Sequence, residues 1–191
     1  MLNLNFDPFP VFNTERLLLR ELSHDDVDEI FELRSDERGM RYIPRPLAKT
    51  LQDAHDHIER NLTLLMNNEA IIWAICLKDD PKLIGTICLW NIQTQHYRAE
   101  VGYQLLTDFH GKGIMQEALN VVLDYGFKTM QLHSVVGIVN PANIPSCKIL
   151  ERTNFVREAL FKENFFFEGR FLDSAVYTLL TKEKAVTSAT A

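Results

Sequence analysis

The spacing of apolar residues changes abruptly in the middle of the chain, and this change most constrains the fold. Between residues 51 and 65, apolar side chains recur on one helical face, at Leu51, Ala54, Ile58, Leu62 and Leu65. Two unbroken apolar runs follow, Ala70–Leu77 and Leu83–Trp90, separated by the charged, proline-containing stretch Lys78–Lys82. Such runs predict a β-hairpin. The chain is therefore expected to pack helices against a sheet.

The remaining elements follow from the same patterns and from capping residues. Helices are predicted from Ser23 to a point before Gly39, from a cap at Thr50, over Gly113–Met130 and over Asn143–Thr153. Further strands are predicted over Glu15–Glu21, Arg98–Leu106, Ser134–Val139, Phe155–Phe161 and Phe171–Leu180. Residues 1–14 are expected to form an extended lead-in, and Ser35–Lys49 a basic loop that is either solvated or a lid over a ligand. No repeat or linker interrupts this order, which predicts one α/β domain with a mixed sheet over residues 1–184 and a flexible tail at 185–191.

Composition excludes several classes of protein. With 46% apolar residues among 191, the chain can bury a core, and it is neither disordered nor collagen-like. The net charge of −6 argues against non-specific binding to nucleic acid. Three cysteines without metal-ligand spacing predict free thiols in a reducing compartment. The longest apolar run is too short for a membrane helix and no signal peptide is evident, so a soluble cytoplasmic protein is expected.

The segment His110–Gly113 joins a predicted strand to the long helix, and its two glycines and lysine suit close backbone approach to an anion. A nucleoside-triphosphate P-loop would need glycine at Leu106 and Ser or Thr at Gly113. A dinucleotide fingerprint would need a small residue at Gln116. A pyrophosphate such as that of coenzyme A stays possible. So does a glycine turn that caps the helix and binds nothing.

Four further patterns occur in a recognisable order: Thr14–Arg20 (TERLLLR), Ala99–Leu105 (AEVGYQL), Gly111–Leu119 (GKGIMQEAL), and Asn143–Ser146 (NIPS) with Leu150–Phe155 (LERTNF). On these segments the chain, over roughly Phe12–Thr181, resembles the GNAT N-acetyltransferase superfamily, in particular its RimJ/RimL-type branch. The resemblance implies an α+β fold with a mixed, mostly antiparallel sheet of about seven strands and about four helices. In that fold the fourth and fifth strands splay apart and leave a cleft for acetyl-CoA.

The resemblance implies two catalytic residues. Glu100 would be the general base that takes a proton from the amine; alternatively it is a strand carboxylate paired with Arg98 or Lys82. Ser146 would donate a proton to the leaving sulfur; alternatively it serves the start of a helix capped by Asn143.

The resemblance also implies a set of residues that bind acetyl-CoA as co-substrate. They are Tyr103, Leu105, His110, Gly111, Gly113, Ile114, Met115 and Asn143. Lys112 and Lys148 are further candidates, for the coenzyme A phosphates; alternatively they are solvated surface lysines. Backbone amides near Tyr103–Leu105 would hold pantetheine and the thioester oxygen. Three positions depart from the family pattern: His110 replaces Gln or Arg, Met115 a small residue near the phosphates, and Asn154 a glycine. Asn154 tolerates a left-handed conformation.

The expected activity is acetyl-CoA-dependent transfer to a primary amine by direct attack in a ternary complex. The acceptor would be a protein N-terminal α-amino group or a small amine. A non-catalytic acyl-CoA-binding module is the alternative. No metal is expected, because His55 and His57 are two apart on a predicted helix and lack partners at ligand spacing. No nucleic-acid or membrane partner is expected, and a homodimer is possible. Cys147 is expected to be a buried thiol, with a mixed disulfide to coenzyme A as the alternative.

Overall fold

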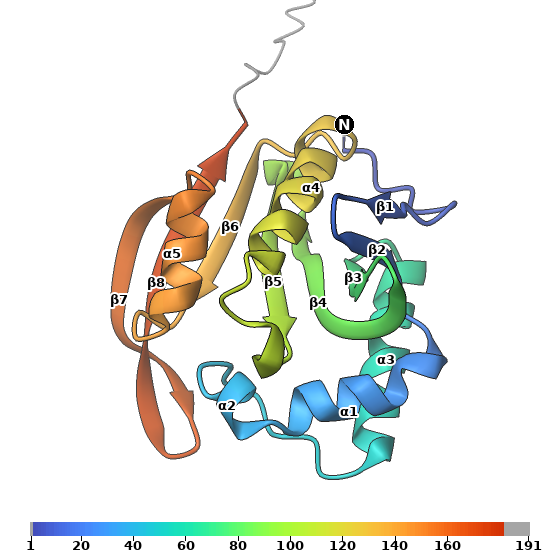
Figure 1. Cartoon of the computed structure of the whole chain (residues 1–191). Coiled ribbons are helices and arrows are strands. Elements are labelled where there is room, and N and C mark those ends of the chain that lie inside the picture. The colour runs from blue at the N-terminus through green and yellow to red at the C-terminus, as the bar shows by residue number, and fades with distance from the viewer. Residues whose placement is uncertain (1, 182–191) are drawn as a thin grey trace, which may run out of the picture.

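The computed structural model describes residues 2–181 and arranges them around an eight-stranded sheet of order β1-β2-β3-β4-β5-β6-β8-β7 (Figure 1). All neighbouring strands are antiparallel except β5 and β6, which are parallel. The strands are β1 (Phe12–Asn13), β2 (Leu17–Glu21), β3 (Ile71–Leu77), β4 (Asp80–Gln93), β5 (Arg98–Leu105), β6 (Ser134–Val139), β7 (Val156–Phe167) and β8 (Arg170–Leu180). The predicted mixed, mostly antiparallel α+β fold is confirmed, with β1 as a short addition from the expected lead-in.

Helices cover both faces of this sheet. They are α1 (Val27–Ser35), α2 (Glu37–Met40), α3 (Leu51–Met66), α4 (Ile114–Lys128) and α5 (Ile144–Arg152). In β3, Ile72, Ala74 and Cys76 pack with the buried side chains of α1 and α3, whereas Ile71, Trp73 and Ile75 pack with those of α4 and α5. The continuous apolar run of β3 is thus explained, because both of its faces are buried.

Two hairpin turns are tighter than the sequence suggests. Leu77 pairs with Asp80, so Lys78 and Asp79 alone make the first turn, and the expected five-residue connection is wrong. Glu168 and Gly169 make the β7–β8 turn, and both have positive φ, 46° and 77°. Two-residue turns of this kind match the twist of the flanking strands. Both hairpins are therefore longer than predicted.

The basic loop after α1 contains the short helix α2, which the sequence patterns did not indicate. Asp36 caps it by accepting hydrogen bonds from the backbone amides of Arg38 and Gly39. The same carboxylate accepts a hydrogen bond from the Thr107 hydroxyl, after β5. On β5 itself, the Gln104 amide donates to the Leu33 carbonyl oxygen at 2.6 Å. These contacts fix the α1–α2 region against the end of β5.

The tail predicted at 185–191 lies outside the described residues. Within residues 2–181, no helix combines the length and apolar character needed to cross a bilayer.

We predict that Gly85→Ala destabilises the protein by about 1–3 kcal/mol, because overpacking a sheet forces the backbone to shift. A Cβ at Gly85 would lie 2.5 Å from the Gln104 carbonyl oxygen and 3.0 Å from Leu105 Cα, both on β5. Gly39→Ala is the matched control, because its Cβ would meet only side-chain atoms, Asp36 Oδ2 at 3.2 Å and Gln104 Nε2 at 3.8 Å. Urea unfolding measures both. Equal stability of Gly85→Ala and the wild type would contradict the packing described here.

Candidate active site

The strands β5 and β6 part in the middle of the sheet. They pair only from Arg98 opposite Ser134 to Glu100 opposite Val136. Beyond this point β5 stays paired with β4 as far as Leu105, and β6 with β8 as far as Val139. The two strands therefore diverge below Glu100, as Figure 1 shows. The edge of β5 after Glu100 has no partner on β6, so its backbone groups are free to bind a ligand.

Residues of β5 alternate between the two faces of the sheet at this opening. Val101 and Leu105 belong to the core cluster beneath α4, and Tyr103 packs against the same cluster. The alternation places Glu100, Gly102 and Gln104 on the face of α1 and α2. Glu100 and Tyr103 therefore lie on opposite faces of the sheet at the point where the strands part.

Glu100 is half-buried at the point where the strands part. Burial raises the pKa of its carboxyl, while a hydrogen bond from the Asn91 side chain and the charges of Arg45 and Arg98 oppose this rise. Pairing with Lys82 is not observed, because Lys82 contacts Glu29 at 4.0 Å. Among the described residues, Glu100 makes no ion pair. A carboxylate with a raised pKa and no cation bound to it is suited to accept a proton.

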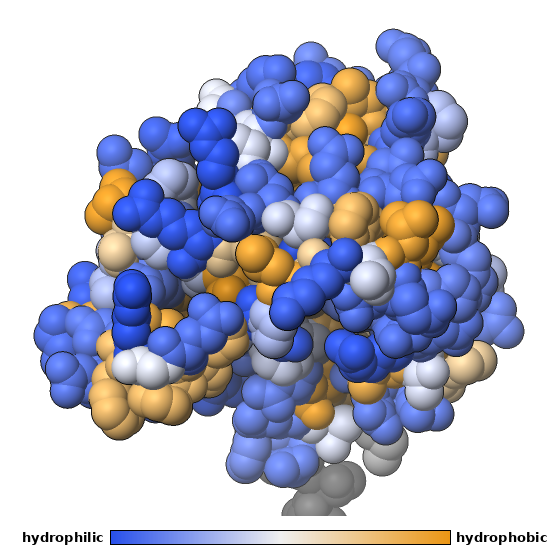
Figure 2. All heavy atoms as spheres, turned by 90° about the horizontal axis from the view of Figure 1, so that it is seen from below, coloured by the Kyte–Doolittle hydropathy of each residue, from blue (hydrophilic) through white to orange (hydrophobic). Residues whose placement is uncertain are grey.

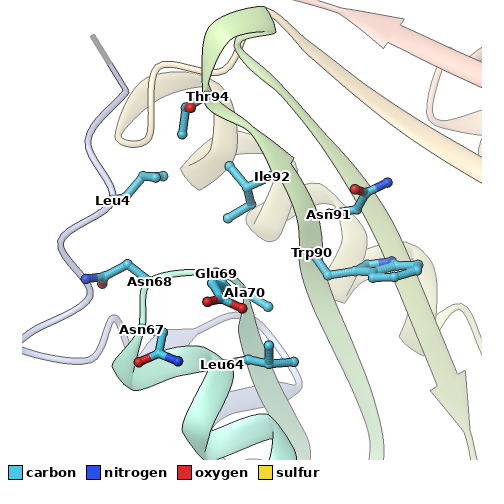
Figure 3. A pocket seen from close by; sticks show the side chains of 10 residues that line it. All are labelled: Leu4, Leu64, Asn67, Asn68, Glu69, Ala70, Trp90, Asn91, Ile92 and Thr94. Atoms are coloured by element: carbon cyan, nitrogen blue, oxygen red, sulfur yellow. The ribbon is translucent and has the colours of Figure 1, made fainter.

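A bulge in β4 brings Asn91 to this carboxyl. Trp90 lies opposite Glu100 and Gln93 opposite Arg98, so β4 has an additional residue between these pairs, and Asn91 has a φ of 48°. Side chains at a bulge no longer alternate strictly. Figure 3 shows Trp90 and Asn91 on the same side of the strand, with Ile92 on the other.

The glycine-rich turn before α4 has the geometry of an anion site. Gly111 and Gly113 have φ values of 72° and 76°, which favour glycine. A Cβ on Gly111 would meet nothing within 4 Å, so the backbone there is open to a ligand. Gly113 caps α4 without a side-chain acceptor, and the first amides of a helix have no partner within it. A diphosphate fits this turn, since it would accept hydrogen bonds from these amides.

A clamp from the N-terminal part of the chain holds this turn. We use "the clamp" for Thr14, Arg16 and Glu117. The Glu117 carboxylate accepts hydrogen bonds from the Thr14 hydroxyl at 2.5 Å, the Arg16 backbone amide at 2.9 Å and Arg16 Nε at 2.7 Å. Arg16 Nη1 donates to the Lys112 carbonyl oxygen at 2.8 Å. The first motif of the resemblance, TERLLLR, thus packs against the third.

The predicted cofactor residues of this turn differ in their exposure. His110, Gly111, Lys112 and Gly113 are exposed, and His110 Nε2 lies 2.9 Å from the Leu105 carbonyl oxygen. The side chains of Ile114 and Met115 are buried in the core. The Met115 side chain faces the core from the first turn of α4, and its place relative to the phosphates stays a prediction. Its backbone amide remains in the first turn.

Across the opening, the Tyr103 hydroxyl and Ser146 Oγ are hydrogen-bonded at 2.8 Å. Burial raises the pKa of Tyr103 to about 12, although the hydrogen bond with Ser146 opposes this. Asn143 caps α5, since its side-chain oxygen accepts a hydrogen bond from the Ser146 amide at 3.3 Å. The Ser146 hydroxyl is thus directed to Tyr103. The two hydroxyl groups of this pair lie beside the unpaired edge of β5.

The other residues singled out in the sequence lie around this opening. Cys147 is buried, as expected, and Lys148 is exposed on α5. Lys112 Nζ lies 5.3 Å from the centroid of the Phe109 ring. Asn154 has a φ of 66°, so the left-handed conformation expected in place of glycine is confirmed.

Sequence reasoning missed the phenol of Tyr103 and the side chain of Asn91. Period-two alternation on β5 would have placed Tyr103 on the face of the later helices, but nothing local indicates its partner 43 residues away. Asn91 has no signal, because its bulge contains neither glycine nor proline.

The spacing of His55 and His57 in the sequence did not indicate the neighbours of His55. His55 lies not beside His57 but against His24, with ring centroids 5.0 Å apart, and His24 Nε2 lies 3.3 Å from a Glu59 carboxylate oxygen. These three side chains group where the short 3-10 helix His24–Asp26 meets α3. We assign them no part in the site, because they belong to neither β5 nor the glycine-rich turn.

Two hollows lie near the opening. The first, of about 420 Å³, lies between α2 with its following loop and the β7–β8 hairpin, on the side that Glu100 faces. The second, of about 550 Å³, lies between Leu4, the end of α3 and Ile92, and the Trp90 and Asn91 side chains extend away from it (Figure 3). None of the predicted site residues lines either hollow.

Comparison with known proteins agrees with this geometry. Residues 16–156 match the family model described as Acetyltransferase (GNAT) domain. The N-acetyltransferase p20 of Bacillus licheniformis is 32% identical over 172 residues, covering 90% of this chain and 97% of the relative. Spermidine N(1)-acetyltransferase of Vibrio cholerae is 27% identical, covering 87% and 95%.

Solved structures share the fold. A GNAT-family acetyltransferase from Bacillus anthracis has a TM-score of 0.81 and 28% identity, covering 91% of this chain and 100% of that one. RimL, a ribosomal L7/L12 alpha-N-protein acetyltransferase in complex with coenzyme A, has a TM-score of 0.81 at 19% identity, covering 90% and 98%. The resemblance seen in the sequence is confirmed: this chain is an N-acetyltransferase of the GNAT family, with RimL-type proteins among its structural neighbours.

Proposed function

We propose that the protein transfers an acetyl group from acetyl-CoA to a primary amine, by direct attack within a ternary complex. The observation that carries this proposal is the opening between β5 and β6. A proton acceptor, Glu100, faces one side of it, and the hydrogen-bonded pair Tyr103–Ser146 faces the other. Acetyl-CoA would enter from the side of α4 and the amine from the side of α2.

The cofactor contacts follow from the turn and the strand edge. The diphosphate would bind the backbone amides after Gly111, with Lys112 at the exposed rim. Pantetheine would lie along the unpaired edge of β5 and bind its backbone groups from Tyr103 to Leu105. Asn143 and Lys148, at the start of α5, lie on the same side of the sheet.

The reaction uses one proton acceptor and one proton donor. Glu100 takes a proton from the ammonium group, directly or through water, and the freed nitrogen attacks the thioester carbon. Amides on the edge of β5 would stabilise the oxyanion, a type of contact worth about 2.7–4 kcal/mol in another enzyme. As the carbon–sulfur bond breaks, the nitrogen of the intermediate loses its second proton to water. The Ser146 hydroxyl donates its proton to the thiolate and recovers one from solvent through Tyr103. The products are the amide and coenzyme A.

Two acceptor classes are consistent with this site, protein N-termini and small amines. Of the relatives described above, one is named as acting on spermidine and one on a ribosomal protein. We place the reaction in the cytoplasm. The three cysteines are free, as suits a reducing compartment.

The proposal is tested by thermal unfolding with acetyl-CoA, followed by thiol release on a panel of amines and peptides. Acetyl-CoA at about 100 times its Kd should stabilise the protein by about 2.7 kcal/mol, because it binds only the native state. Thiol should be released with at least one acceptor. No stabilisation would contradict acetyl-CoA binding. Stabilisation without release on any acceptor would favour a binding module.

Glu100→Gln should lower kcat about 100-fold or more, while the Kd for acetyl-CoA stays nearly constant. The base acts when it is deprotonated, so wild-type kcat/KM should fall as the pH falls through the raised pKa of Glu100, above its ordinary value of 4.5. The Glu100→Gln variant should lack this fall in kcat/KM at low pH, which we call the acid limb of the pH profile.

Asn91→Gly provides a matched control for this assignment. Glycine accepts the positive φ of Asn91 but removes the amide that lowers the pKa of Glu100. The acid limb should therefore move to higher pH. A limb that stays in place in Asn91→Gly, together with unchanged turnover in Glu100→Gln, would exclude Glu100 as the base.

Ser146→Ala and Tyr103→Phe should each lower the rate of thiol release by about tenfold to a hundredfold, because proton donation to the leaving sulfur is lost or weakened. The Kd for coenzyme A should change little, since Asn143 still caps α5 in both variants. Rapid-quench kinetics and equilibrium binding measure the two quantities. A loss of stability with full turnover would instead assign Ser146 to the helix start alone.

A further inference from the structure

Three arginines without ion-pair partners line the hollow on the acceptor side. Arg41 and Arg45 come from the connection between α2 and α3, and Arg170 from the start of β8. None of them forms an ion pair among residues 2–181. Two carboxylates, Glu37 and Glu168, also line the hollow. Positive charge therefore exceeds negative charge on its walls.

More positive charge lies behind this wall. Arg34, on α1, donates from Nη2 to the Pro46 carbonyl oxygen at 3.4 Å, and its pKa is lowered by burial and then by the charges of Arg45 and Arg60. His57 is held neutral beside the same three arginines, since burial and their charges lower its pKa to about 4. Like charges that gather in excess of carboxylates repel one another, and a bound anion relieves this repulsion.

Arg45 connects the hollow to the reacting centre. Its guanidinium lies 6.0 Å from the centroid of the Trp90 ring, and Trp90 is the residue opposite Glu100 in the β4–β5 pair. Trp90 Nε1 would lie 3.5 Å from a Cβ on Gly102, so the indole covers β5 next to the base. An acceptor whose amine meets Glu100 would thus extend past Trp90 towards the arginines.

Most of the remaining lining residues are apolar. Ile43, Pro44, Phe167 and Leu172 line the same hollow. Figure 2 looks at the molecule from this lower end, and shows apolar surface on the side of the β7–β8 hairpin next to hydrophilic surface. The hollow suits a chain with an apolar middle and a charged end.

We propose that the acceptor is a primary amine whose far end carries an anionic group, a carboxylate or a phosphate, bound by Arg41, Arg45 and Arg170. This inference rests on the proposed acetyl transfer and specifies its substrate class. Guanidinium groups bind such oxyanions through paired, charge-assisted hydrogen bonds. A polyamine would instead place an ammonium group against these arginines. The charge on the acceptor therefore distinguishes this protein from its spermidine-acetylating relatives.

The first experiment compares three amines of equal chain length: 5-aminopentanoate, pentylamine and cadaverine. Their far ends are a carboxylate, a methyl group and an ammonium group. Thiol release should give a kcat/KM for 5-aminopentanoate about tenfold above that for pentylamine, or about 1.4 kcal/mol. The difference should lie in KM, and cadaverine should be the poorest of the three.

The second experiment removes the charges on the protein. Arg41→Gln and Arg170→Gln should each lower the ratio of kcat/KM for 5-aminopentanoate to kcat/KM for pentylamine from about tenfold to near one. Arg157→Gln is the matched control, because Arg157 is exposed at the opposite end of the same hairpin. This variant should prefer 5-aminopentanoate over pentylamine as strongly as the wild type does.

Peptides separate the two sources of the anion. Ser-Glu-Glu-Ala amide and Ser-Gln-Gln-Ala amide differ only in side-chain charge, and a preference for the first would indicate an acidic protein N-terminus. A preference restricted to 5-aminopentanoate or O-phosphoethanolamine would indicate a small molecule. Calorimetric binding of both peptides is measured as well, so that charge preference is known even without turnover.

Failure of the inference differs from failure of the proposed function. Thiol release that is fastest with cadaverine, or equal for all three amines, would overturn the anionic acceptor and leave acetyl transfer intact. The anionic acceptor would also be overturned if two results occurred together. The two peptides would bind with equal calorimetric affinity, and the Arg170→Gln variant would give the same rate as the wild type with each of the three amines. No thiol release with any acceptor would contradict the transfer itself.

Discussion

The parting of β5 from β6 after Glu100 is the constraint on which the rest of the structure depends. A sheet ordinarily continues its ladder of hydrogen bonds, and strands that leave it must satisfy their backbone groups otherwise. Here β4 holds one side of the opening along the whole of β5, and β8 holds the other along the whole of β6. Each half of the sheet is therefore complete without the other, and the gap persists because neither strand lacks a partner on its outer side.

Two separate packing clusters maintain this arrangement. The cluster beneath α4 and α5 contains Leu119 and Val122 of α4, together with Val101 of β5 and Val135 of β6. The cluster beneath α1 and α3 positions the acceptor side through Leu33 and Ala74. The cofactor side and the acceptor side thus belong to different cores. Substitutions that alter acceptor choice can occur in one core without disturbing the other.

The fold could be predicted from the sequence because its periodic and capping signals are local and because the order of motifs resembles that of a known family. The location of the site stays a prediction. The glycine turn, the carboxylate at Glu100 and the cap at Asn143 are each encoded within a few residues. Their roles in the reaction remain predictions. The contacts that complete the site are not local. The Tyr103–Ser146 pair joins residues 43 apart and the clamp joins residues 101 apart, and no periodicity reports which distant side chains meet.

The distribution of charge around the acceptor hollow could not be predicted from the sequence either. The net charge of −6 suggests little about the acceptor, because the whole-chain sum hides where the arginines gather. The loop at Ser35–Lys49 is basic in sequence, but only the fold brings Arg170, from the other end of the chain, to the same hollow. Local charge rather than net charge governs recognition at a site.

The clamp has a consequence for how the cofactor side responds to motion elsewhere. The turn that would bind phosphate takes its shape from Arg16, which directly precedes β2, and β2 pairs only with β3 and the two-residue strand β1. Segments near a sheet edge open more readily than its centre. Opening of this edge would release Arg16 from Glu117 and Lys112, and the turn would lose its order. Occupancy of the turn and protection of the N-terminal strands from hydrogen exchange are therefore thermodynamically linked, although 96 residues separate Arg16 from Lys112.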